Sequence, residues 1–188
     1  MADQSGSGRA GAVLRASALA AIAGGALRVA NGFTTNLLPG PTLALLYLVT
    51  DVLLLLGVAG IWWRRRPALG AAGHIGVGIF VVGILLIRVA AFGVLGAGGY
   101  QAGAAVALLG LVVYSVETLI RRNASLCPPV LWLVSLACGI LGALGVARAF
   151  PTSAFPTSAF LSGAAGVTFG LGFVIAGIEG WRAPGVRG

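Results

Sequence analysis

Residues 41–67, PTLALLYLVTDVLLLLGVAGIWWRRRP, decide the fold of this chain. Between its two prolines lies an apolar run that carries one acid, Asp51, and ends in two tryptophans and three arginines. A membrane-spanning helix needs about 20 mainly apolar residues. Tryptophans gather where such helices leave the hydrocarbon, and arginines collect on the cytoplasmic side. The stretch therefore predicts a transmembrane helix that ends at a cytoplasmic surface.

The composition of the whole 188-residue chain has the same character. Hydrophobic residues make up 59% and charged residues 9%, and the mean hydropathy is +1.03. A soluble domain carries about 25% charged residues, so this chain is expected to have the lipid bilayer as its partner. The same composition excludes a nucleic-acid-binding role despite the net charge of +8, because arginines of a membrane protein are first of all topology signals.

Turn signals divide the chain into six apolar segments, and all eight prolines lie in or beside the connections. We therefore expect an all-α membrane protein in which residues 1–188 form a single transmembrane domain. The six predicted spans are about 11–31, 42–63, 68–92, 101–120, 129–149 and 159–180. Arg15 interrupts the first apolar core, which a cleaved signal peptide would keep continuous, so we expect the first helix to be retained.

The arginines predict the orientation of these spans. There is no lysine, and nine of the twelve arginines fall on one side of the six-span arrangement: Arg9, Arg15, Arg64, Arg65, Arg66, Arg121, Arg122, Arg182 and Arg187. Positive residues mark the cytoplasmic side, so both termini are expected in the cytoplasm. Arginine without lysine, together with 31 glycines, indicates a bacterial genome rich in G and C. We therefore expect a multi-pass protein of the bacterial inner (plasma) membrane.

The other three arginines indicate an internal repeat. Arg28, Arg88 and Arg148 are each 60 residues apart and are followed by similar sequences, RVANGF, RVAAFG and RAF. This period predicts three tandem helical hairpins, at about 9–66, 67–127 and 128–188. Each hairpin starts in the cytoplasm, so the repeats are expected to be parallel, with an axis along the membrane normal.

Arg28, Arg88 and Arg148 are the first candidate ligand-binding residues. Counted along the helix from Arg66, Arg88 comes to about 33 Å, at the outer boundary of the hydrocarbon. Three guanidinium groups around one axis would bind a phosphate, a carboxylate or a lipid headgroup. The alternative is that each arginine reaches a phospholipid phosphate by itself and only marks a helix end.

Asp51 is the most specific single candidate for a functional residue. It lies about 19 Å from the inner edge of its span, hence near the middle of the membrane. A carboxyl group there must be protonated or paired, because desolvation disfavours the charged form. It could serve as a proton relay, a cation site, an acid catalyst or a ligand contact, or form a hydrogen bond between helices, aided by Thr50.

Three further residues are candidates for chemistry: His74, Glu117 and Glu179. Glu117 precedes Arg121 by four residues and Glu179 precedes Arg182 by three, and both spacings favour ion pairs on one helix face. The alternative for both acids is the lining of an inner vestibule. His74, in GAAGHIGVG, is interpreted as a hydrogen-bonded residue of a helix interface.

No metal or cofactor site is expected. Cys127 and Cys138 are about 16 Å apart along one helix, too far for a disulfide, and no Cys/His cluster has metal-ligand spacing. Small residues on several spans, including Gly166 and Gly170 in a GxxxG pattern, predict close helix contacts within the chain or with a second copy.

The sequence leaves three functions open. The first is the handling or transport of a small or amphipathic ligand, and the second is a non-catalytic accessory or scaffold subunit that would have other membrane subunits as partners. The third is an intramembrane enzyme acting on a lipid or isoprenoid with a carboxyl group as general acid. The chain has no GxSxG, HExxH, CxxC or P-loop motif, so a non-enzymatic role is favoured.

Overall fold

The computed structural model describes residues 5–34, 39–94, 96–122, 125–143 and 157–183, and within these ranges every regular element is an α-helix. The six predicted segments are confirmed as helices whose ends differ from the predicted spans by a few residues. The helices are α1 Ser5–Thr34, α2 Gly40–Arg65, α3 Ala71–Ala91, α4 Gly96–Arg121, α5 Cys127–Ala143 and α6 Thr157–Arg182. Residues 144–149 of the predicted fifth span lie outside the described residues.

Five of the helices are long and apolar enough to cross a membrane, and the described part of α5, apolar over Cys127–Gly142, is shorter. Large apolar side chains such as Leu45, Leu56 and Ile75 are more than half exposed on the outside of the bundle. Such a surface is stable against lipid tails and not against water. The chain is therefore a multi-pass membrane protein in contact with the bilayer.

Proline and local hydrogen bonds set the ends of the helices. Pro39 precedes α2, and Pro41 stands in its first turn, where a missing N–H costs nothing. At its other end the Arg66 N–H still bonds the Trp62 carbonyl oxygen at 2.7 Å before the chain turns into α3. α4 ends where Arg122 adopts a left-handed conformation, with a φ of 49°.

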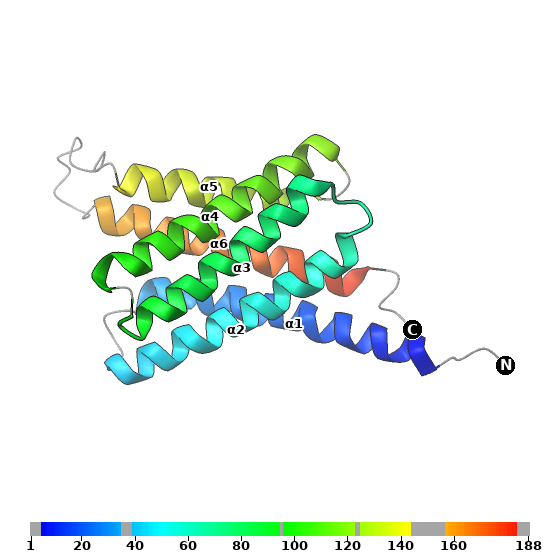
Figure 1. The fold of residues 1–188 in the computed structure, drawn as a ribbon, viewed down its shortest axis with the longest axis horizontal. Helices are drawn as coiled ribbons and strands as arrows, with labels where there is room; N and C mark the ends of the chain where they lie inside the picture. Colours follow the sequence, from blue (N-terminus) through cyan, green and yellow to red (C-terminus); the bar gives the residue numbers. More distant parts are fainter. Residues whose placement is uncertain (1–4, 35–38, 95, 123–124, 144–156, 184–188) are drawn as a thin grey trace.

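The helices form an up-and-down bundle (Figure 1). α1 begins and α6 ends at the same end of the bundle, and the turns from α2 to α3 and from α4 to α5 lie there too. Because arginines stand at these turns, we name it the arginine end. Each helix packs against the next along the chain, and α6 closes the ring by packing on α1. The packing is unequal: it is most extensive between α3 and α4 and between α1 and α6, and least extensive, among consecutive helices, between α2 and α3.

Glycines bring the most extensively packed helices together. A Cβ at Gly110 of α4 would lie 2.6 Å from the Gly76 carbonyl oxygen of α3, and one at Gly25 of α1 would lie 2.5 Å from the Gly170 carbonyl oxygen of α6. Backbones approach this closely only where a side chain is missing. The predicted GxxxG is thus half correct, since Gly170 makes such a contact and a Cβ at Gly166 would meet nothing within 4 Å.

An aromatic cluster fills the centre of the ring. Phe80 of α3 and Phe173 of α6 are fully buried, with ring centroids 5.9 Å apart. The ring centroid of Trp132 of α5 lies 5.1 Å from that of Phe173. The ring centroid of Phe169, also on α6, lies 5.2 Å from that of Phe173. Aromatic packing therefore joins α3, α5 and α6.

Candidate functional site

Asp51 and Arg88, both predicted as ligand-binding residues, form an ion pair between α2 and α3. Arg88 Nε lies 2.7 Å from Asp51 Oδ2, and the two side chains are 18% and 12% exposed. Both lie within helices that cross the hydrocarbon. A charge there is stable only when it is paired, so the pair accounts for Asp51 being tolerated in an apolar run.

The pair joins residues at different distances from the arginine end. The Arg88 backbone lies about 26 Å from the start of α3, and Asp51 lies about 21 Å from the end of α2, both measured from the arginine end. The Arg88 side chain bridges this difference to reach the aspartate. The depth predicted for Arg88 in the membrane stays a prediction.

Arg28 of α1 lies one helical turn before Asn31, whose side chain bonds Thr50 next to Asp51. The Arg28 guanidinium carbon lies 5.8 Å from the centroid of the Phe169 ring on α6. Among the described residues no carboxylate lies within ion-pair distance of Arg28. The arrangement therefore brings together two cations and one anion.

Asn31 and Thr50 complete this group. The Asn31 side-chain amide donates a hydrogen bond of 3.2 Å to Thr50 Oγ1, which in turn donates to the Leu46 carbonyl oxygen at 2.8 Å. Both side chains are at most 1% exposed. The sequence analysis did not single out Asn31, although its place three residues after Arg28 puts both on one face of α1. We call Arg28, Asn31, Thr50, Asp51 and Arg88 the midspan cluster.

The third predicted arginine, Arg148, lies outside the described residues. Of the other two predicted arginines, Arg88 pairs with a carboxylate and Arg28 contacts the Phe169 ring, and their grouping with Arg148 stays a prediction.

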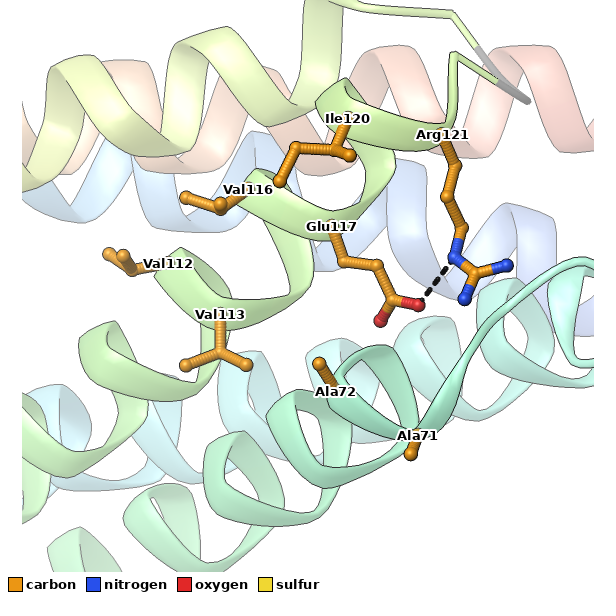
Figure 2. A pocket seen from close by; sticks show the side chains of 8 residues that line it. All are labelled: Ala71, Ala72, Val112, Val113, Val116, Glu117, Ile120 and Arg121. Atoms are coloured by element: carbon orange, nitrogen blue, oxygen red, sulfur yellow. Dashed lines mark hydrogen bonds and ion pairs between the residues drawn. The ribbon is translucent and has the colours of Figure 1, made fainter.

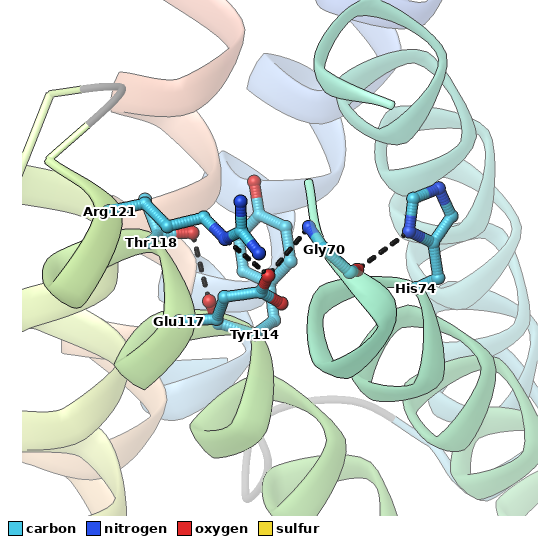
Figure 3. A network of polar contacts seen from close by, with 6 residues as sticks. All are labelled: Gly70, His74, Tyr114, Glu117, Thr118 and Arg121. Atoms are coloured by element: carbon cyan, nitrogen blue, oxygen red, sulfur yellow. Dashed lines mark hydrogen bonds and ion pairs between the residues drawn. The ribbon is translucent and has the colours of Figure 1, made fainter. Parts of the chain in front are cut away.

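A second polar network lies at the arginine end, around Glu117 of α4 (Figure 3). Glu117 Oε1 accepts a hydrogen bond of 2.6 Å from the Gly70 N–H and one of 2.7 Å from Arg121 Nε. The predicted pair of Glu117 with Arg121 is thereby confirmed. Gly70 precedes the first residue of α3, so the carboxylate also faces the positive end of that helix dipole. With Glu117 only 8% exposed, these contacts join α4 to the start of α3.

Glu179 has a different partner from the one predicted. Its Oε2 lies 3.4 Å from Arg65 Nη2 on α2, and not in an ion pair with Arg182 on its own helix. The neighbouring Arg64 donates a hydrogen bond to the Gly180 carbonyl oxygen. Two successive arginines of α2 are thus bound to the end of α6, which places these helices together at the arginine end.

His74 is an exposed residue of α3 that is hydrogen-bonded, as expected, and contacts a neighbouring helix. Its Nδ1 is 2.8 Å from the Gly70 carbonyl oxygen, one turn earlier in the same segment (Figure 3). Its ring packs edge-on against Trp62 of α2, with centroids 6.1 Å apart. The structure keeps His74 away from the midspan cluster, because it stands near the other end of α3.

The two polar groups differ in what they could do chemically. The acids at the arginine end each face a basic partner, so their charges are matched within the protein. The midspan cluster has one guanidinium more than it has carboxylates. Within the described ranges no group of three His, Cys, Asp and Glu side chains is placed to hold a metal ion, and Cys127 and Cys138 are free thiols.

Comparison with known proteins finds no matching family model, no matching curated protein and no matching solved structure. The function is therefore argued from the geometry of the chain itself.

Proposed function

We propose that this protein binds and handles, or transports, a small or amphipathic anion at the midspan cluster. The observation that carries the proposal is the surplus cation. Arg88 takes the one carboxylate of the cluster, and Arg28 lies against the face of Phe169 without an acid within ion-pair distance among the described residues. A charge within the hydrocarbon is stable only when it is paired, and a bound anion would pair the surplus one.

The chemistry of the cluster favours a phosphate or carboxylate group. A guanidinium offers planar paired donors that match such oxygens. An anion that reached Arg28 would also compete with Asp51 for Arg88. The Asp51–Arg88 pair links α2 and α3, whose packing is the least extensive among consecutive helices. If the anion replaced Asp51 as the partner of Arg88, anion binding would be coupled to a separation of α2 and α3.

The location and the repeat belong to the same proposal. We place the arginine end in the cytoplasm of a bacterium and the midspan cluster in the outer half of its inner membrane, following the positive-inside rule. The 60-residue period makes Arg148 the third member of the arginine set, contributed by the third of three parallel hairpins.

Native mass spectrometry of the gently purified protein, before and after removal of lipid, tests the proposal. The unaltered protein is expected to carry a stoichiometric anion that Arg28→Gln and Arg88→Gln both lose. Arg182→Gln removes an exposed arginine from the end of α6 and is expected to keep the anion. A protein with only exchangeable phospholipid, or an anion that both midspan variants retain, would contradict the proposal.

A second candidate function is a non-catalytic subunit of a membrane complex. It is favoured by the glycine contacts and by the ion pairing of Asp51, Glu117 and Glu179, each of which already has an arginine partner. Stoichiometric copurification with another membrane protein, together with the absence of a bound anion, would favour this function over ligand handling. The same ion pairs weigh against an enzyme, since none of these acids is held ready as a protonated general acid.

A further inference from the structure

A surface groove of about 600 Å³ lies between the start of α3 and the second half of α4. Figure 2 shows the two helices and the side chains along it: Ala72 from α3, and Val112, Val116 and Ile120 from α4. Glu117 and Arg121 stand at its end toward the α4–α5 turn. The groove is therefore apolar along its length and charged only at the arginine end.

The groove opens outward and not into the bundle. Ile120 is 76% exposed and Val116 is 42% exposed. Val112, Val116 and Ile120 follow one another at intervals of four residues, so the apolar wall is about 12 Å long and runs along the helix axis. A channel of this shape, parallel to the membrane normal, suits one acyl chain of a lipid.

The charges at the end of the groove are positive on balance. Arg121 is half exposed, and Arg122, one residue further, is exposed. Glu117 is 8% exposed, and its carboxylate is bound by the Gly70 N–H and Arg121 Nε. A buried and bound carboxylate cannot receive a lipid ammonium group, whereas the arginines are available to a phosphate.

We propose that this groove binds an anionic phospholipid. One acyl chain lies along Val112, Val116 and Ile120, and the phosphate is bound by Arg121 and Arg122. Two arginines against one carboxylate leave a single positive charge, which matches the net charge of such a headgroup and not that of a zwitterionic lipid. This site is separate from the midspan cluster, because it uses α4 and the other end of α3.

Titration of phosphatidylglycerol into delipidated protein, with phosphatidylethanolamine as the zwitterionic comparison, tests the site. Arg122→Gln removes an exposed cation that takes no part in the Glu117 network, and Val116→Trp fills the groove. Arg122→Gln is expected to weaken phosphatidylglycerol binding about tenfold, as the loss of one charge-assisted contact does, and Val116→Trp is expected to weaken it by excluding the acyl chain. The matched controls are Arg182→Gln at the end of α6 and Leu109→Trp, a 54% exposed position of α4 outside the groove.

Equal affinity of the unaltered protein for the two lipids would overturn the proposal, as would unchanged binding in both variants. A loss in Arg122→Gln without one in Val116→Trp would mean a surface phosphate contact and would overturn the placement of the acyl chain. Where Val116→Trp does not fold, Ile120→Trp replaces it, because Ile120 lines the same groove and is 76% exposed. The anion lost on substitution of Arg28 is measured separately, so failure of either site leaves the other standing.

Discussion

At the scale of single residues, the membrane interior makes an unpaired charge the most expensive feature of this chain. Asp51 and Arg88 each stand in an otherwise apolar run, and each removes the cost of the other by direct contact. Neither residue can be understood alone, because the stability of one charge depends on the presence of the other.

Replacing one member of this pair is expected to destabilise the protein more than replacing both. Asp51→Asn leaves the Arg88 charge buried without its counter-ion and should lower the free energy of unfolding by about 3 kcal/mol. The double variant Asp51→Asn/Arg88→Gln should recover part of that loss. Unfolding by SDS in mixed micelles, arranged as a double-mutant cycle, measures the coupling. Additive losses would show that the two side chains act independently.

Glu117 and Glu179 allow a comparison between a buried and a more exposed acid. Glu117→Gln weakens two short charge-assisted hydrogen bonds in a buried place and should cost about 1.5–3 kcal/mol. Glu179→Gln removes a 3.4 Å pair whose side chains are 23% and 30% exposed, and should cost less than about 1 kcal/mol. Thermal unfolding in detergent measures both. A larger loss for Glu179→Gln would contradict the assigned roles.

At the scale of helices, backbone contact at glycines decides which pairs pack tightly. Lipid tails and apolar side chains are equally apolar, so helices gain little from simply leaving lipid. They gain from close fit, and α3 and α4 achieve it where glycines remove the side chains between them. Among consecutive helices the α2–α3 pair packs least, and its ion pair matters correspondingly more.

A methyl group at Gly110 should therefore disrupt the α3–α4 pair. Gly110→Ala would bring its Cβ against the backbone of Phe80 and within 2.6 Å of the Gly76 carbonyl oxygen. We expect a loss of about 1–3 kcal/mol, as in other overpacked contacts. Gly78→Ala on α3 is the matched control, because a Cβ there meets nothing within 4 Å. Equal unfolding free energies for the two variants would show that the helices do not approach so closely.

At the scale of the whole molecule, the closed ring gives the protein two unlike ends. The arginine end carries the start of α1, the end of α6 and the arginines at the ends of α2 and α4, and the opposite end carries the ends of α1 and α3 and the starts of α2 and α4. This difference between the ends makes the orientation in the membrane testable with the protein's own cysteine.

Cys127, the first residue of α5, is exposed at the arginine end. In a Cys138→Ser background, a membrane-impermeant maleimide should label it in inverted membrane vesicles and not in intact cells. A cysteine introduced at the exposed Pro39, before α2 at the opposite end, should show the reverse. Labelling of Cys127 in intact cells would place the arginine end outside.

Some features of this protein follow from the sequence by itself. Spacing predicted the six helices and the Glu117–Arg121 pair, because an apolar length and an interval of four residues are properties of one helix. Simple energetics predicted that Asp51 must be protonated or paired. These inferences need no knowledge of how one helix lies against another.

Other features were decided only by the tertiary structure. That Asp51 pairs with Arg88, that Glu179 pairs with Arg65, and that α6 closes on α1 all depend on the rotation and offset of whole helices. Those quantities are set by which glycine faces fit together, as at Gly25 and Gly170. The spacing of residues along the chain does not determine the rotation or the offset of a helix. Any apolar face of a helix is stable against lipid, so only close packing between helices decides which face is buried.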